Sequence, residues 1–348
     1  MRLHTSVWAT LAIAVLVAGC TTPAKNVLVT PPATPAGEIV IRVATAANTN
    51  AYAAGKAAAE ALKTQLGDTA PHLILMNECY DERRLKARVL RGVASVFPRK
   101  IIFGASSYGA FAQSGCLDAD AVALVAIGGP GIAVSTALQT DLGVSRLTFE
   151  KHQAQIEERL HAAGERLMGT LSRGPRDRLL ILVADAHSPK NGPLVEGVQK
   201  AVAKGFPIVG GSANKNAGQT YVYYQGMMYR DSVLGIMLSG DFKVALAGRM
   251  AKENAKVIST AKDGAAEAMK TLGVKPIGAL AFNCAGRKGR LTHIGLELKA
   301  MQQALGADVP LYGCYCAGEI GPADLADKTP GVVSSGVGWH VMFALIGR

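Results

Sequence analysis

Three segments of this chain repeat one pattern, and that repetition constrains the fold more than any other feature. The segments at 97–109, 206–218 and 309–321 read FPRKIIFGASSYG, FPIVGGSANKNAG and VPLYGCYCAGEIG. Each has an apolar residue, a proline, a short apolar strand, a glycine, small or polar residues and a further glycine. Because glycine and proline mark turns, their recurrence favours a repeated structural unit over the general similarity of α/β sequences.

Apolar runs at 73–76, 179–183 and 279–282 come before the three repeats, with an amphipathic stretch between each run and its repeat. The spacing to the first glycine of the repeat is nearly constant: 31 positions from Leu73 to Gly104, 30 from Leu180 to Gly210 and 33 from Leu280 to Gly313. A strand, a helix and a second strand in this order form a strand–helix–strand unit. We therefore expect an α/β fold with mixed sheets, built from three such units with added antiparallel hairpins. Residues 132–138 are expected to pair back antiparallel on the apolar strand at 121–127.

The composition fits a chain with a large apolar core. Of its 348 residues, 49% are hydrophobic, enough for one large domain or two medium ones. The formal net charge is +11, but there is no long Lys/Arg block and no interleaving of basic with aromatic residues. Scattered positive charge favours solubility or anionic partners, so the sequence gives no support for nucleic-acid binding.

Residues 1–20 have the composition of a targeting segment. Arg2 and His4 precede an apolar stretch at 7–18, which is short for a membrane span, and the segment ends Leu-Val-Ala-Gly-Cys. This ending resembles the bacterial lipoprotein signal, which implies that Cys20 is lipidated and becomes the new N-terminus. Thr21 in place of an aspartate favours the outer membrane, with the folded body facing the periplasm. An uncleaved anchor and ordinary secretion are the alternatives.

Residues 21–37 contain four prolines among threonines, alanines and a lysine. A segment of this composition cannot bury a core. We therefore expect a disordered tether that joins the lipid anchor to a folded body beginning near Glu38.

Polar and thiol side chains follow the ends of the repeated strands. In an α/β fold the carboxyl ends of the strands gather at one edge, where ligands bind. The glycine turns are expected to approach the same cleft. The candidate ligand-binding residues are Ser106, Ser107, Asp185, Gly210, Gly211, Ser212, Asn214, Cys284, Arg287, Gly313, Cys314 and Glu319.

Three features of this set favour a small anionic or zwitterionic ligand. Arg287 could hold a carboxylate in two-point contact, the glycine turns would expose N–H donors, and Glu319 could bind an amino group. The alternatives are structural roles: Arg287 could form a salt bridge with Glu297 or Glu319, and Asp185 could cap a helix or form a turn. His187 is more typical of a surface or structural histidine.

Five cysteines follow residue 20, and an exported protein meets conditions in which disulfides form. Cys79 and Cys116 flank the first repeat, while Cys284, Cys314 and Cys316 belong to the third. This parallel predicts disulfides within repeats, including one between Cys284 and either Cys314 or Cys316. An odd number leaves one thiol free. Buried free thiols are the alternative.

Two other classes of function compete with ligand binding. A nucleophilic enzyme would use Cys284, Cys314 or Ser212 with a histidine base, but there is no G-x-S-x-G motif and no histidine in any of the three turns. A soft-metal or redox site would use Cys284, Cys314 and Cys316, which lack paired C-x-x-C spacing. The residues favour non-catalytic binding of a small molecule, without a cofactor.

Several segments are similar to those of the FIST family, a sensory domain of bacterial signalling proteins: FPIVGGSA, DSVLGIMLSGDF, AFNCAGRKGR and PLYGCYCAGEIGP. The resemblance covers about residue 38 to the end, with 38–240 like the FIST N part and 241–348 like the FIST C part. It implies a sensor of small ligands such as amino acids. No segment resembles a fused output domain, so we expect signalling to pass through a partner.

Overall fold

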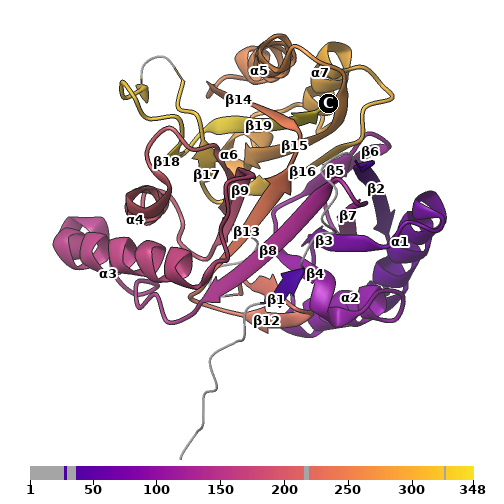
Figure 1. The fold of residues 1–348 in the computed structure, drawn as a ribbon, viewed down its shortest axis with the longest axis horizontal. Helices are drawn as coiled ribbons and strands as arrows, with labels where there is room; N and C mark the ends of the chain where they lie inside the picture. Colours follow the sequence, from indigo (N-terminus) through magenta and orange to yellow (C-terminus); the bar gives the residue numbers. More distant parts are fainter. Residues whose placement is uncertain (1–26, 30–36, 215–218, 325–326) are drawn as a thin grey trace, which may run out of the picture.

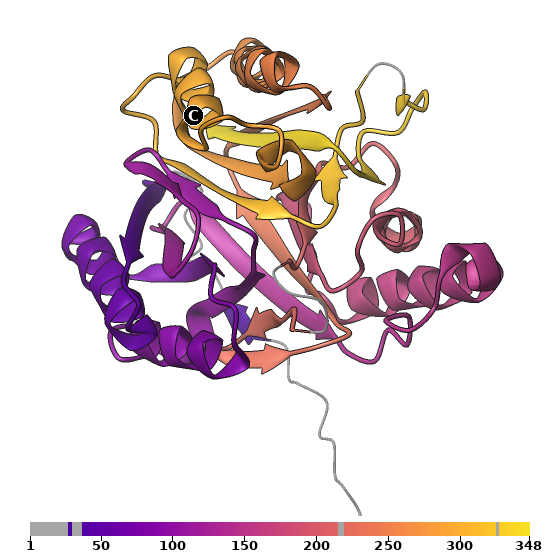
Figure 2. The same cartoon turned by 180° about the vertical axis from the view of Figure 1, so that it is seen from behind.

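The structure is a computed structural model that describes residues 27–29, 37–214, 219–324 and 327–348 (Figure 1). Over these residues the chain forms three mixed β-sheets. The inner faces of the sheets share one apolar core, and pairs of helices cover their outer faces, as Figures 1 and 2 show from opposite sides. The mixed α/β fold class predicted from the sequence is confirmed.

Each predicted repeat forms two parallel strands joined by a helix. Short helices also precede the second strand of the first unit (η1, Arg99–Ile101) and follow the first strand of the third (α6, Ala285–Lys288). The three units are β3 (Pro71–Glu78), α2 (Arg83–Ala94) and β4 (Ile102–Ser106); β9 (Asp177–Ala184), α4 (Asn191–Val202) and β10 (Ile208–Ser212); and β15 (Pro276–Cys284), α7 (Gly295–Leu305) and β16 (Leu311–Cys316).

Two antiparallel strands extend each parallel pair on one side. The added strands are β2 (Val40–Ala47) and β7 (Ala121–Gly128) beside β3, β8 (Ile132–Gln139) and β13 (Val233–Gly240) beside β9, and β14 (Lys243–Met250) and β19 (His340–Gly347) beside β15. The prediction that 132–138 pairs back on 121–127 is wrong. Both edges of β7 are taken by β2 and β3, so β8 crosses to the next sheet and pairs with β13.

A hairpin follows each unit and pairs with a different unit. The hairpins are β5 (Ala110–Ala112) with β6 (Gly115–Leu117), β11 (Val222–Tyr224) with β12 (Met227–Tyr229), and β17 (Glu319–Gly321) with β18 (Ser335–Val337). The first hairpin adds to β16 of the third unit, the second to β4 of the first unit, and the third to β10 of the second unit. The exchange closes the three units into a ring.

The helices bury apolar faces against the outside of the three sheets (Figure 1). Helices α1 (Ala51–Leu66) and α2 cover the first sheet, α3 (Phe149–Thr170) and α4 the second, and α5 (Asn254–Leu272) and α7 the third. Near-continuous apolar strands such as β7, buried at every position, are typical of sheets covered on both faces.

The tether expected over 21–37 needs correction in one part. Val27–Val29 forms a short strand, β1, that pairs antiparallel with the edge strand β8. An unpaired sheet edge offers free N–H and C=O groups, and Val-Leu-Val is rich in β-branched residues that favour strands. The lipidation site predicted at Cys20 lies outside the described residues. No helix in the described part of the chain has the length and apolar character needed to span a membrane.

Candidate functional site

The three glycine turns meet at one place in the ring. Backbone N–H groups of Asn214, Tyr108 and Ser188 donate to the carbonyls of Ser106, Tyr315 and Ala317 at 2.9, 3.0 and 2.9 Å. Each of these bonds joins two different units. The predicted approach of 210–214 to 313–319 is also present, because Gly211 lies opposite Glu319 in the β10–β17 pair.

The repeated glycines allow close backbone approach between neighbouring strands. Gly104 and Gly210 have φ values of 142° and 157°, and a Cβ at either would lie 1.8 Å from the carbonyl oxygen of Met76 or Leu182. A Cβ at Gly313 would lie 2.2 Å from the ring of Phe111. The glycines that we expected to expose N–H donors are therefore needed for strand packing.

The predicted serines are buried and bonded to the backbone. The Ser107 hydroxyl donates to the Glu78 carbonyl at 3.2 Å, and the Ser212 hydroxyl donates to the Ala186 carbonyl at 2.8 Å. The Ser106 Oγ accepts from the Tyr221 N–H at 3.0 Å. These contacts hold the turns in place.

Asp185 also organises the backbone. Its carboxylate accepts from the Thr220 hydroxyl at 2.6 Å and from the Asp231 N–H at 2.8 Å. The Nε2 of His187 lies 3.6 Å from Asp185 Oδ1, and burial lowers the pKa of this histidine. The geometry matches the turn-forming role that the sequence left open for Asp185.

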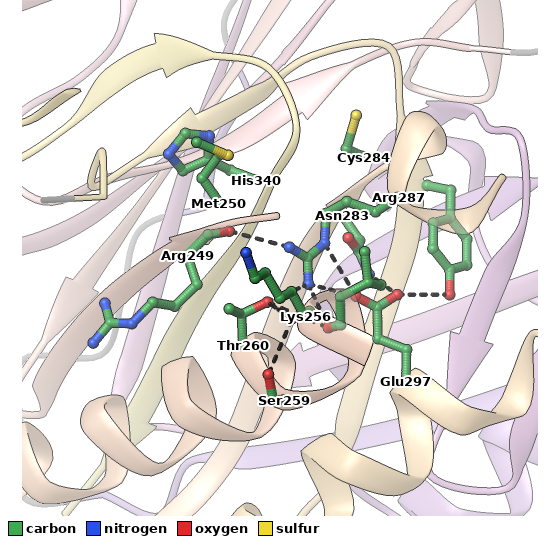
Figure 3. A network of polar contacts seen from close by, with 12 residues as sticks. Arg249, Met250, Lys256, Ser259, Thr260, Asn283, Cys284, Arg287, Glu297 and His340 are labelled. Carbon is green, nitrogen blue, oxygen red and sulfur yellow. Dashed lines mark hydrogen bonds and ion pairs between the residues drawn. The ribbon is translucent and has the colours of Figure 1, made fainter. Parts of the chain in front are cut away.

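Arg287 lies in a buried ion pair with Glu297, not on the wall of a cleft (Figure 3). Both side chains have zero exposed surface. The guanidinium donates to Glu297 Oε1 from Nε at 3.1 Å and from Nη2 at 2.8 Å, and Nη2 also donates to the Val257 carbonyl at 2.8 Å. The expectation that Arg287 faces a ligand carboxylate is wrong, because Glu297 occupies the fork of the guanidinium.

Both carboxylate oxygens of Glu297 have hydrogen-bond partners. Its second oxygen accepts from Asn283 Nδ2 at 2.6 Å and from the Tyr315 hydroxyl at 3.2 Å. Burial raises its pKa, while the charge of Arg287 opposes that rise. This carboxylate network stabilises the third unit beneath α7.

A second buried ion pair lies in the first unit, between Glu78 and Lys86 at 3.3 Å. Glu78 also accepts from the Tyr223 hydroxyl at 2.6 Å and from the Tyr80 N–H at 2.7 Å. Lys86 was not predicted from the sequence to be a buried partner. The signal was its spacing, since Lys86 shares the buried face of α2 with Val89 and Val93.

Glu319 is the fully buried carboxyl without an ion-pair partner in the described residues. Its Oε2 accepts from the His340 N–H at 3.0 Å. Its Oε1 has no hydrogen-bond partner of ordinary geometry in the described chain, although the Cys284 thiol is close enough to favour the ionised form. Burial raises the pKa of Glu319 to about 8, so this carboxyl is mostly protonated at neutral pH.

The thiol beside Glu319 belongs to Cys284, at the end of β15. Its sulfur accepts from the Gly286 N–H at 3.3 Å. Burial and the nearby Glu319 raise the pKa of this thiol to about 11. A thiol with so high a pKa is protonated at neutral pH and is a poor nucleophile.

All five cysteines of the described chain are free thiols, so the predicted disulfides are absent. Cys284 and Cys316 are register partners on β15 and β16, and the sulfurs of Cys314 and Cys316 are 3.5 Å apart. A disulfide needs about 2.05 Å between sulfurs. Cys79 packs in the central core and Cys116 against the outer core beneath α7. The part of the chain that the structure describes has no group of three His, Cys, Asp or Glu placed to hold a metal ion.

Comparison with solved structures gives distant likenesses. Cyanuric acid hydrolase from A. caulinodans is 10% identical with a TM-score of 0.45, covering 89% of this chain and 100% of that one. PurLQS from Thermotoga maritima is 9% identical with a TM-score of 0.33, covering 93% and 74%. These low scores carry no argument about function. Curated proteins gave no match.

Comparison with family models identifies the chain. The FIST N domain matches residues 73–252 and the FIST C domain matches residues 217–322. The boundary predicted between 240 and 241 falls where the two matches overlap, and it stays a prediction. The chain therefore belongs to the FIST family, whose domains are sensory domains of signal transduction that bind small ligands.

Proposed function

We propose that this protein senses a small ligand that carries a positively charged amino group, and that Glu319 binds that group. The single observation that supports this is the contrast among buried carboxyls. Glu78 has Lys86 and Glu297 has Arg287, whereas Glu319 Oε1 has no partner of ordinary geometry in the described residues. A fully buried carboxyl oxygen without a partner calls for an explanation, and a functional role is one that such positions often have.

The proposed interaction couples binding to a proton. An ammonium group beside Glu319 would favour its carboxylate and lower its pKa from about 8. The ligand would thus replace a proton by a cation, and the affinity would increase with pH between about 6 and 8 while the ligand amine stays protonated. The protonation state of Glu319 would then depend on whether the ligand is bound.

An amino acid is the ligand class that we favour. Its ammonium group suits Glu319, and backbone N–H groups could bind its carboxylate. We further propose that the protein is anchored to the outer membrane through Cys20, faces the periplasm, and signals through a partner protein.

We propose a non-catalytic role for the same site. The Cys284 pKa of about 11 opposes formation of a thiolate. The imidazole of His340 is engaged, because its Nε2 accepts from the Asp324 N–H at 3.1 Å and its Nδ1 lies 2.7 Å from the Gly338 carbonyl. A nucleophile needs a base within reach, and this histidine is committed elsewhere.

A paired ligand screen tests the proposal. Amino acids and their des-amino analogues are compared by thermal shift and then by calorimetry, on wild type and on Glu319→Gln, which keeps the oxygen that accepts from His340. The matched control is Glu165→Gln, an exposed glutamate on α3 paired with Lys200. Loss of a charge-assisted bond predicts binding weaker by about one to two orders of magnitude in Glu319→Gln alone.

Three results would count against the proposal. Equal binding by wild type and Glu319→Gln would make Glu319 structural. Equal binding of an amino acid and its des-amino analogue would remove the amine from recognition. Turnover of the ligand by the purified protein would replace the sensory function by an enzymatic one.

A further inference from the structure

Strand β14 forms an open edge of the third sheet. In the described chain it pairs only with β19, and Figure 1 shows it as an outer strand near α5. The Met250 N–H points away from β19, because it donates to Asp324 Oδ2 at 2.9 Å. By the two-residue period of a strand, the backbone groups of Gly248, Leu246 and Val244 point the same way.

The backbone groups that point away from β19 differ along β14 in whether they have hydrogen-bond partners. The Gly248 carbonyl accepts from the guanidinium of Arg249 at 2.8 Å. The backbone groups of Val244 and Leu246 make no bond on the outward side to any described residue. The middle of the edge therefore presents unused donors and acceptors.

A groove runs along this edge. A cavity of 580 Å³ includes Phe242, Lys243 and Val244 in its lining, and one of 510 Å³ includes residues 244–249. The two cavities share Gly205, Pro207 and Thr271 as well as Val244, so they lie next to each other along the strand. We call the combined space the β14 groove. Its far wall includes residues 205–207 of the second unit, and 322–324 and 331–333 around the third hairpin.

The same position in the second sheet is already filled by an added strand. β8 is related to β14 by the repeat, since β8–β13–β9 and β14–β19–β15 have the same pairing order. Val27–Val29 pairs antiparallel with β8 in the position that would be the groove side of β14. The fold thus accepts a short extended segment at this edge, and no described strand occupies it on β14.

We propose that the β14 groove binds an extended segment of a partner protein by strand addition. The free backbone groups of Val244 and Leu246 would supply the ladder, as in other cases of β-augmentation. At one end of the edge, Asp324 occupies the Met250 N–H and Arg249 occupies the Gly248 carbonyl. The hydrogen-bond ladder is therefore limited to about three or four residues. The segment is a partner's because the described chain uses its own Val-Leu-Val strand on β8.

The groove also defines the chemistry of the segment. Val244, Leu246 and Val333 are partly exposed or exposed apolar side chains on its walls, which suit small apolar residues at alternate positions. Arg178, Lys243 and Lys328 supply positive charge along the lining. The acidic residues of the same lining are already engaged, because Asp177 pairs with Arg173, Glu267 pairs with Arg249, and Asp324 accepts from the Met250 N–H. We therefore expect acidic residues on either side of the apolar core of the segment.

A short hydrogen-bonded chain connects the groove to Glu319. The His340 N–H donates to Glu319, the Asp324 N–H donates to His340 Nε2, and Asp324 Oδ2 accepts from the Met250 N–H of β14. Through these bonds, a change in the ionisation of Glu319 would be transmitted to the Met250 end of the groove. The docking proposal itself does not depend on any ligand at Glu319.

The test uses a fluorescein-labelled synthetic peptide, EVLVTVE, whose core copies the chain's own Val-Leu-Val-Thr segment. Its binding to the full-length protein is followed by fluorescence anisotropy, and amide protection by hydrogen exchange. We expect saturable binding with new protection at Val244 and Leu246. Leu246→Pro removes an outward N–H that the sheet does not use, and should weaken binding about tenfold or more.

A second probe covers the case in which Leu246→Pro fails to fold. The same peptide methylated at alternate backbone nitrogens cannot complete the ladder, and should bind wild type about tenfold or more weakly. Binding that survives methylation, protection located on β8 instead of β14, or no binding at all would overturn the proposal. Self-association of the protein that protects β14 without peptide would also overturn it, in favour of a second copy as the occupant.

Discussion

Three buried glutamates show how single residues divide between stability and function. Glu78 and Glu297 each have a buried basic partner and a tyrosine hydroxyl. Glu319 has a backbone donor and a neighbouring thiol, and its pKa is raised to about 8. The carboxylates of Glu78 and Glu297 therefore stabilise the fold, whereas the carboxyl group of Glu319 could bind a ligand.

Arg287→Ala should destabilise the protein strongly, because it leaves Glu297 buried without its counter-ion. Breaking a buried ion pair by removing one partner typically costs about 3–5 kcal/mol. The measurement is the free energy of unfolding from denaturant titration. Arg290→Ala is the matched control, since Arg290 lies three residues after Arg287, is exposed, and should change stability little when replaced. Equal stability of the two variants would contradict the structural role of Arg287.

The contacts of individual residues were only partly predictable. The sequence allowed a salt bridge between Arg287 and Glu297 because both lie in the third unit, but local spacing could not decide between that pair and a ligand. The Glu78–Tyr223 bond joins residues 145 positions apart, and no local pattern carries such a contact. The role of Glu319 as a site residue stays a prediction.

At the scale of elements, the repeated glycines make close strand pairing possible. Gly104→Ala should cost at least about 2 kcal/mol, because a Cβ would lie 1.8 Å from the Met76 carbonyl at a φ of 142°. Gly169→Ala is the control: it is exposed near the end of α3 with no atom within 4 Å of the added Cβ, and should stabilise by up to about 1 kcal/mol. Thermal unfolding of both variants checks this, and a neutral Gly104→Ala would refute it.

The elements were predictable where their signals were local. Apolar runs and glycine turns predicted the three strand–helix–strand units, and the two strands of each unit pair in parallel. The exchange of hairpins was not predictable. β5 pairs with β16 some 200 residues later, and short strands such as 110–112 carry no sign of their partner. The crossing of β8 to the next sheet was missed because it depends on which edges are already occupied.

At the scale of the whole molecule, the exchanged hairpins make the two family regions depend on each other. A chain of residues 38–240 would lack β17, which pairs with β10, and a chain of 241–348 would lack β5, which pairs with β16. Neither half should fold alone, because each would expose a face of the shared core. Circular dichroism and size-exclusion chromatography of the separate halves check this. A monomeric, cooperatively unfolding half would contradict the ring.

The ionisation of Glu319 tests the central claim most directly. Carbon-13 NMR of labelled glutamate carboxyls, with Glu319→Gln for assignment, should show Glu319 titrating near pH 8, and its pKa should fall when an amine ligand binds. The raised pKa makes the contribution of Glu319 to stability fully present below the usual value of 4.5 and lost as the pH rises through about 8. Wild type should accordingly lose stability relative to Glu319→Gln over that range. A Glu319 resonance that titrates near 4.5 in the free protein would contradict the account.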